Sequence, residues 1–351
     1  MPGFESLIGQ EHSVRLLTNL LQNRTIPHAL LFTGIEGVGK RTAALMFAMA
    51  CNCTNNRPEC YSEHDKTIYC SNGKFSAASP CGRCRSCKKI QSGNHPDIIR
   101  IKPSGHSIKI AQIRALCHTL AMKPYEARMR VVIISDAHAM NPEAGNALLK
   151  VLEEPPDRTI LILTAAQTSD LLPTIVSRCQ HIRFYPVSRK SLETYLIDKY
   201  EFDMDDANII AVLANGSISK ALFMIDPKNK TDWKNIRNWL INEVESLSLR
   251  SIGSILAFAD RLSRNKDALI DSLEMIKSWM RDLIVCKYCP DKIINNDLSD
   301  RIQHASQKTT ATSLLEKIRA IETAIKDIRA NSNLRLTMEV LVIRLAKSGN
   351  S

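Results

Sequence analysis

The sequence of 351 residues has few aromatic residues, no long hydrophobic run and no signal-like beginning. Phe, Trp and Tyr make up 5% of the chain, which argues against a module that works mainly by stacking on single-stranded nucleic acid. No run approaches the roughly 18 apolar residues of a membrane-spanning helix, and MPGFESLIGQ lacks a basic segment followed by an apolar one. We therefore expect a cytoplasmic protein with no membrane partner.

The chain is rich in positive charge and in cysteine. A formal net charge of +11 and a pI near 9.1 favour a polyanionic partner such as nucleic acid. The 11 cysteines of a chain expected in the reducing cytoplasm suggest a metal site before they suggest disulfides. The length allows two or three domains, each with a sizeable core.

The segment GIEGVGK has the pattern of a phosphate-binding loop, G-x-x-x-x-G-K. It follows a buried-strand pattern at 28–33 and precedes an Ala/Leu/Met-rich helical pattern at 41–51. Glycines let backbone N–H groups turn toward an anion, and the loop lysine would reach the β and γ phosphates. The predicted nucleotide-binding residues of this loop are Gly34, Gly37, Gly39 and Lys40.

The loop departs from a working NTPase at the next residue. The position after the lysine normally carries Ser or Thr, whose hydroxyl holds Mg²⁺, but this chain has Arg41. Thr42 lies about 100° further round the helix and should point elsewhere, although we keep it as a candidate ligand. The sequence therefore predicts an NTPase architecture with a damaged catalytic centre.

A second departure follows the apolar run at 131–136, which has the pattern of a Walker B strand ending in Asp136. The next residue in working ATPases of this type is usually Glu, but here it is Ala137. Asp136 could therefore bind Mg²⁺ or could be only a helix cap or loop acid. Thr164, at the end of the strand pattern 159–164, occupies a position from which a sensor residue could face a γ-phosphate.

The polar segment 51–90 contains seven cysteines, including two overlapping C-x-x-C pairs in CGRCRSC. Such spacing lets thiolates grip one tetrahedral Zn²⁺, with a fourth ligand from upstream. Reduced surface thiols or a redox pair would explain the clustering less well. The predicted ligands are Cys81, Cys84, Cys87 and, by preference, Cys53, which closes the preceding helix; the rivals for the fourth place are Cys70, then Cys51 and Cys60. Residues 54–80 then form an insertion.

Strand and helix patterns alternate over 28–185, which predicts a parallel α/β sheet, whereas only helical patterns follow Pro186. A helical pattern also covers residues 4–24, and His95 and Asp97 are better explained by the start of a strand at 98–101 than by metal binding. The predicted domains are 1–186, 187–228 and 229–351. Other predicted helices cover 108–120, 143–156, 234–247, 252–263, 266–289, 311–330 and 334–347. We interpret the later pair Cys286 and Cys289 as coincidental.

Five stretches together resemble a known family: LIGQ, HALLFTGIEGVGK, CGRCRSC, NALLKVLEEPP and LLPTIVSRCQ. The chain resembles the bacterial clamp-loader subunits of DNA polymerase III, members of the AAA+ class. The similarity covers residues 1–225 well, and beyond them mainly the chain length and a final helix beginning near Asn333. It implies an AAA+ P-loop domain with a parallel sheet and an inserted zinc module, a small helical lid domain and an all-α collar domain.

Within this family, the chain is most similar to delta-prime subunits, which typically do not hydrolyse ATP. The motor subunits, gamma and tau, keep the hydroxyl after the loop lysine and an acid after the Walker B Asp, where this chain has Arg41 and Ala137. In the family's zinc module one cysteine precedes C-x-x-C-x-x-C, and counted from Lys40 this cysteine is Cys53. The insertion over 54–80 departs from the family's short spacing.

The resemblance also implies a mechanism and partners. The family forms a pentamer with ATP at subunit interfaces, so Arg178 of Ser177-Arg178-Cys179 would be an arginine finger acting in trans; the alternative is a surface salt bridge. The implied partners are gamma/tau and delta subunits, the sliding clamp and, through the complex, primed DNA. The implied cofactors are structural Zn²⁺ and the neighbour's ATP and Mg²⁺. The chain would lack independent catalysis but belong to the DNA polymerase III holoenzyme, a DNA-directed DNA polymerase.

Two other functions remain open from the sequence. An active ATPase of the gamma/tau type would need Thr42 to hold Mg²⁺ through a shifted helix. A zinc-dependent nucleic-acid-binding module would use the cations around the knuckles, which are Arg83, Arg85, Lys88 and Lys89.

Overall fold

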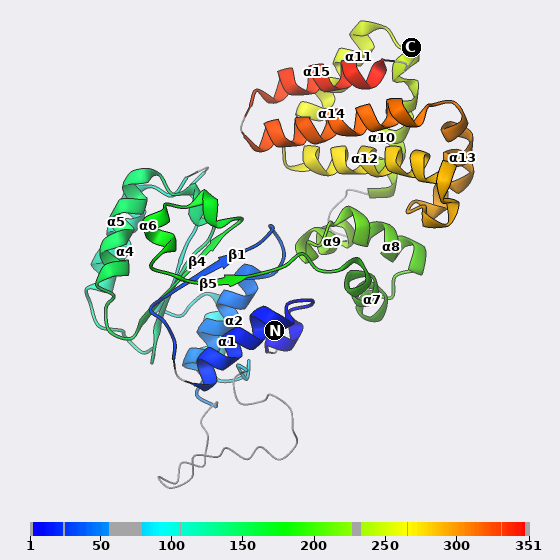
Figure 1. Cartoon of the computed structure of the whole chain (residues 1–351). Helices are drawn as coiled ribbons and strands as arrows, with labels where there is room; N and C mark the ends of the chain where they lie inside the picture. Colours follow the sequence, from blue (N-terminus) through cyan, green and yellow to red (C-terminus); the bar gives the residue numbers. More distant parts are fainter. Residues whose placement is uncertain are drawn as a thin grey trace. The chain divides into compact units, whose positions relative to one another are not determined.

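The computed structural model of the chain describes residues 3–23, 25–55, 79–105, 107–226, 233–264, 266–330 and 332–347. It divides into two compact units (Figure 1). The first unit comprises Met1–Ser191 and Gly216–Ser219, and the second comprises Leu192–Asn215 and Lys220–Ser351. The predicted domain boundary at 186 lies close to the first division, and the three-domain organisation stays a prediction.

The first unit contains a five-stranded parallel sheet with the order β2-β3-β4-β1-β5. The strands are β1 (Ala29–Thr33), β2 (Ile98–Ile101), β3 (Arg130–Ile134), β4 (Thr159–Ala165) and β5 (Gln180–Arg183). Every residue of β1, β3 and β4 is buried, because both faces of these central strands are covered. The sheet confirms the predicted parallel α/β domain.

Helices cover both faces of this sheet (Figure 1). One face carries α1 (Glu11–Gln22) and α2 (Lys40–Asn52), and the other carries α4 (Ile110–Leu120), α5 (Pro142–Glu153) and α6 (Pro173–Val176). A short helix, α3 (Arg85–Ser92), packs against α2. The core of the second face joins Ile113 of α4 and Leu148 of α5 to Val132 and Leu163 of the strands.

Three predicted helices in this unit are shorter than expected, and one of them, α4, begins at Ile110 rather than at residue 108. Residues Phe4–Ser6 form only a 3-10 turn, and Gly9, with φ +64°, separates them from α1. Helix α5 ends at Glu153, before the two prolines that were predicted to stop it.

The direction of the strands separates two edges of the sheet. Because all five strands are parallel, their carboxyl ends share one edge and their amino ends the other. The phosphate-loop motif follows β1, and Asp136 and Thr164 lie at the ends of β3 and β4, so these candidates share the carboxyl edge. Cys53 ends the returning helix α2, and Arg178 precedes β5, so both lie toward the amino edge.

The second unit is entirely helical in its described residues. Its helices are α7 (Arg189–Tyr200), α8 (Met204–Leu213), α9 (Ile218–Ile225), α10 (Trp233–Ser246), α11 (Ile252–Ser263), α12 (Lys266–Tyr288), α13 (Ser299–Gln307), α14 (Ala311–Arg329) and α15 (Leu334–Ala346). The first residues of α7 and of α9 belong to the first unit. Helix α14 packs between α12 and α15, and α15 packs on α11 (Figure 1). The five helices predicted beyond residue 230 are confirmed, each to within one residue at either end. None of the helices in the described ranges is long and apolar enough to cross a membrane.

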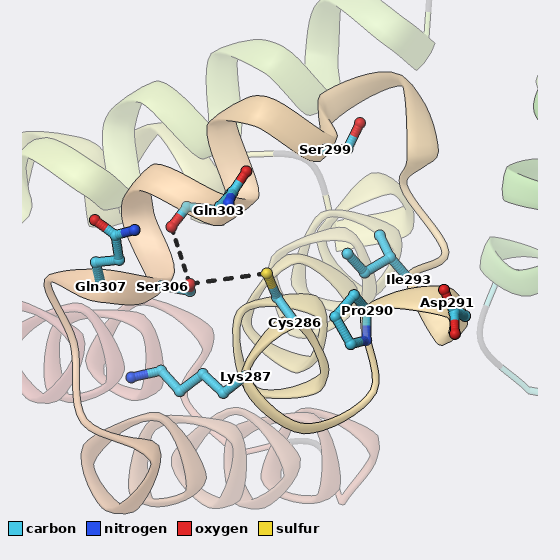
Figure 2. Close-up of a pocket in the computed structure, with 9 residues that line it drawn as sticks. All are labelled: Cys286, Lys287, Pro290, Asp291, Ile293, Ser299, Gln303, Ser306 and Gln307. Carbon is cyan, nitrogen blue, oxygen red and sulfur yellow. Dashed lines mark hydrogen bonds between the residues drawn. The ribbon is translucent and has the colours of Figure 1, made fainter.

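A pocket of about 610 Å³ lies between the end of α12 and α13. Figure 2 shows its lining residues, which are Cys286, Lys287, Pro290, Asp291, Ile293, Ser299, Gln303, Ser306 and Gln307. The Ser306 hydroxyl contacts Cys286 Sγ at 3.9 Å and donates to the Gln303 carbonyl at 3.0 Å. The Lys287 amine donates to the Thr309 carbonyl. These polar groups of the pocket are therefore partnered within the protein.

Candidate functional site

The phosphate-loop motif is shaped by two glycines that a side chain could not replace. Gly34 has φ +146°, and a Cβ there would collide with the carbonyl oxygen of Phe184. Gly37 has φ +74°, and a Cβ there would collide with the hydroxyl of Ser217. The Ser219 N–H donates to the Gly37 carbonyl at 3.1 Å. The segment 216–219 therefore lies directly against the loop, a contact that the sequence did not predict.

Lys40 turns back into this loop. Its amine donates to the carbonyl oxygens of Gly34 and of Ile35, the latter at 2.8 Å. Burial lowers the pKa of Lys40, and the charges of Asp136 and Glu36 oppose this effect. The lysine is thus placed near Asp136, the predicted Walker B acid, and its donors are held by backbone oxygens.

The first turn of α2 contains Arg41, at the position where a working NTPase has the Ser or Thr whose hydroxyl binds Mg²⁺. Gly39 caps the helix with φ +107°, and Lys40 is its first residue. Arg41 is exposed, and Thr42 is half-buried in the same turn. Burial and then the Arg41 charge lower the pKa of Arg100 on β2, so the Arg41 side chain brings positive charge toward that strand.

The structure brings together the predicted residues at the ends of β3 and β4. The Asp136 N–H donates to Thr164 Oγ1 at 3.1 Å. Strand β3 stops at Ile134, and Asp136 has φ +54° and begins a 3-10 turn, so its carboxylate is exposed beyond the strand. Ala137 is 1% exposed and belongs to the core, so the position of the usual catalytic glutamate is filled by a small buried side chain.

Four predicted cysteines form a cluster at the end of α2 and the start of α3. The sulfurs of Cys53, Cys81, Cys84 and Cys87 all lie within 4.8 Å of one another. A tetrahedral zinc with Zn–S bonds of about 2.3 Å would separate its ligands by about 3.8 Å, which this cluster fits. The Cys84 N–H donates to Cys81 Sγ at 3.3 Å, and the Cys87 N–H donates to Cys84 Sγ at 3.4 Å. These four residues could therefore hold a metal ion.

The electrostatics of the cluster differ from thiol to thiol. Burial raises the pKa of Cys53 and of Cys87. Burial also acts to raise the pKa of Cys84, but hydrogen bonds from the Thr54 side chain and the Cys87 N–H lower it to about 6. The Cys84 thiol therefore ionises more readily than a free thiol, and the thiolate is the form that binds a metal.

The rival fourth ligands have different places. Cys51 is buried within α2 outside the cluster, and burial raises its pKa to about 12. Cys60 and Cys70 lie outside the described residues, as does most of the predicted insertion over 54–80. Among the described cysteines, the geometry therefore favours Cys53 over Cys51.

Arg178 forms the surface salt bridge that was the alternative to an arginine finger. Its guanidinium lies 2.8 Å from Glu153 Oε1 and donates to the Thr174 carbonyl at 3.0 Å. The two side chains of the ion pair remain 36% and 50% exposed. An exposed pair of this kind contributes only about 0–1 kcal/mol, so Arg178 can leave it at small cost.

A buried ion pair at the amino edge was not predicted as a unit. Asp97 accepts hydrogen bonds at 2.8 Å from the N–H groups of Tyr125, Glu126 and Ala127, and lies 3.7 Å from the Arg130 guanidinium. Burial acts to raise the pKa of Asp97, but these three hydrogen bonds, together with Arg130, lower it below its usual value. Asp97 is therefore an anchor for a loop, consistent with its predicted place at the start of a strand.

Replacing Asp97 by asparagine should destabilise the first unit by about 3–5 kcal/mol, because Arg130 would stay buried without its counter-charge. The folded-state pKa of Asp97 lies below its ordinary 3.8, so its contribution is present above that pH and is lost as the pH falls through the folded-state pKa. Urea unfolding of both chains between neutral and acid pH should show the difference shrinking in acid. Exposed Asp157→Asn is the control, and a pH-independent difference would contradict this account.

Comparisons with known proteins identify the family. Residues 9–74 and 59–188 match the family described as "DNA polymerase III, delta subunit". Residues 231–347 match its C-terminal counterpart, "DNA polymerase III, delta subunit, C terminal". DNA polymerase III subunit delta′ of Bacillus subtilis (strain 168) is 32% identical over 340 residues, which cover 96% of each chain. This chain belongs to the DNA polymerase III delta-prime subunit family.

Relatives of the delta-prime family extend to tau. DNA polymerase III subunit tau of the same Bacillus subtilis strain is 25% identical over 99% of this chain, which spans only 62% of that protein. A solved gamma subunit-related protein from Thermotoga maritima covers 95% of this chain and 98% of its own at 16% identity, with a TM-score of 0.44. The delta-prime resemblance predicted from the sequence is confirmed by this family match.

Proposed function

We propose that this delta-prime family member is a clamp-loader subunit that does not hydrolyse ATP and supplies Arg178 to a neighbouring ATPase subunit. It would act in the cytoplasm with gamma/tau and delta subunits to load the sliding clamp onto primed DNA. The observation that carries the proposal is a P-loop domain that lacks both catalytic groups. Arg41 stands in place of the Mg²⁺ hydroxyl, and buried Ala137 stands in place of the catalytic acid.

The contacts of the P-loop support loss of hydrolysis. Lys40 is held by the carbonyls of Gly34 and Ile35, and Ser219 lies against Gly37. A nucleotide would have to break the lysine contacts, and its Mg²⁺ would meet the Arg41 charge rather than a hydroxyl. Gly39, Thr42, Asp136 and Thr164 complete a site that keeps the shape of a nucleotide site without the groups that activate water.

The position of Arg178 supports action in trans. It precedes β5 and lies toward the amino edge of the sheet, whereas the chain's own P-loop lies at the carboxyl edge. One domain cannot bring these two edges together, so Arg178 would serve the nucleotide of another subunit. The weak pair with Glu153 would keep the guanidinium at the surface until that neighbour binds.

The cysteine cluster would hold a structural Zn²⁺. All four positions of a tetrahedron are supplied by Cys53, Cys81, Cys84 and Cys87, which leaves no open position for a substrate. The metal would join the end of α2 to the start of α3, since Cys53 caps the first helix and Cys84 the second.

ATP turnover separates this proposal from an active gamma/tau-type ATPase. The chain alone is expected to give no turnover, whereas its addition to the motor and delta subunits, clamp and primed DNA should raise their turnover. Chain with Lys40→Ala is the control for contaminating ATPase and should still raise turnover in the complex. Turnover by the chain alone that Lys40→Ala abolishes would contradict the proposal and would make Lys40 and Thr42 catalytic.

A further inference from the structure

The loop between α4 and β3 presents two apolar side chains to water. We refer to residues 121–129 as the Tyr125 loop. Tyr125 is 86% exposed, and Met122 is 65% exposed. If the loop folded inward, these two side chains would be buried, which would stabilise the isolated chain. A loop that holds both of them in water therefore points to a role in binding.

The Tyr125 loop is held rigidly by the buried ion pair below it. The Asp97 carboxylate accepts hydrogen bonds from three successive N–H groups of the loop, those of Tyr125 to Ala127. On the other side, the Arg130 guanidinium donates hydrogen bonds to the carbonyl oxygens of Thr119 at 3.1 Å and of Met122 at 2.7 Å. The side chains of Asp97 and Arg130 are each only 4% exposed. The Tyr125 ring is therefore presented by a preorganised backbone, which lowers the entropy cost of binding a ligand.

The surface around this ring is strongly basic. The Lys89 amine of α3 lies 2.6 Å from Glu126 Oε1, which places the loop beside the cysteine cluster. The Arg85 charge also acts on Glu126 and helps to lower its pKa, after the hydrogen bond and charge of Lys89 and the charge of His95. Segments 79–90 and 121–129 carry six basic residues and one acidic residue, which are Arg83, Arg85, Lys88, Lys89, Lys123, Arg128 and Glu126. All the basic residues except half-buried Lys89 are exposed.

We propose that the Tyr125 loop and α3 form a binding surface for single-stranded nucleic acid. Tyr125 would stack on one base, and the exposed arginines and lysines would contact the phosphates on either side of it. Charge favours this ligand over a neutral apolar protein segment, because the lone acidic side chain is already paired with Lys89. The surface lies at the amino edge, away from the P-loop, so this activity is independent of nucleotide binding and of the proposed function.

Fluorescence anisotropy with a labelled oligo(dT) of about 16 nucleotides tests the proposal on the full chain, purified with its metal. Tyr125→Ala should weaken binding at least about fivefold with an unchanged salt slope, and Tyr125→Phe should retain binding. Arg85→Gln combined with Lys88→Gln should make the slope of log K against log salt shallower by about 1.4. Tyr288→Ala is the matched control, because Tyr288 is 71% exposed in the second unit.

Three outcomes would overturn the assignment. The first is an absence of binding at low salt. The second is that Tyr125→Ala and Tyr288→Ala bind oligo(dT) with equal affinity. Tyr125 would then not stack on a base, and an acidic protein would be the better candidate ligand of the Tyr125 loop. The third is an equal loss by Tyr125→Ala on a long duplex, in which nearly every base is stacked on both faces. These measurements use no ATP and no other subunit, so their failure would leave the proposed function untouched.

Discussion

In the assembled loader, Arg178→Ala is expected to reduce ATP hydrolysis at the neighbouring site that it faces by about 10³–10⁵-fold, with ATP still bound there. The reason is that a guanidinium stabilises charge that develops only in the transition state, so its loss lowers kcat rather than affinity. Single-turnover hydrolysis in complexes whose other sites carry inactivated motor subunits isolates this one site. Nucleotide affinity, measured in parallel, should change little.

Glu153 offers the control that separates a finger from a surface salt bridge. Glu153→Gln also breaks the ion pair with Arg178 but leaves the guanidinium in place. An exposed pair contributes about 0–1 kcal/mol, so this variant should change turnover by no more than about fivefold. Arg178→Lys keeps the charge but loses the planar fork and should remain impaired. Near-normal turnover in Arg178→Ala, matched by Glu153→Gln, would show that Arg178 serves only its own surface.

The parts of the fold that the sequence predicted are those with a repeating apolar pattern. The run Val131–Ile134 is apolar on both faces, and it forms a central strand. Edge strand β5 escaped prediction because only Ile182 of its four residues is buried, so it has neither an apolar run nor alternation. Helix α13 escaped for the same reason, since Ile302 is its one large buried apolar residue.

The candidate site divides in a similar way. The cysteine cluster was predictable because three of its four cysteines lie within seven residues of the sequence, in CGRCRSC. The contacts Asp97 with Arg130, Ser219 with Gly37 and Glu153 with Arg178 join distant parts of the chain, and single residues of these types carry no signal by themselves. These residues come into contact only when the sheet and its helices have assembled, so the sequence alone does not pair them.

The cysteine cluster gives the second large expected effect. Cys53→Ser or Cys84→Ser should abolish tight binding of zinc, measured by metal analysis of the purified chain, because three thiolates no longer close the tetrahedron. Structural zinc sites contribute about 10–16 kcal/mol of apparent binding free energy in small zinc-finger peptides. In this larger domain, loss of the metal should lower the melting temperature of the first unit and raise hydrogen exchange in α3, whose N-cap is Cys84.

Cys51→Ser is the matched control for this experiment, because Cys51 is buried two residues before Cys53 but lies outside the cluster. It should keep its zinc, and any loss of stability should come only from placing a hydroxyl in the core. Cys60→Ser and Cys70→Ser, which test the remaining rivals, should also keep their zinc. If Cys53→Ser keeps its zinc and one of these other variants loses it, the fourth ligand is the other cysteine. The metal would then not join α2 to α3 through Cys53.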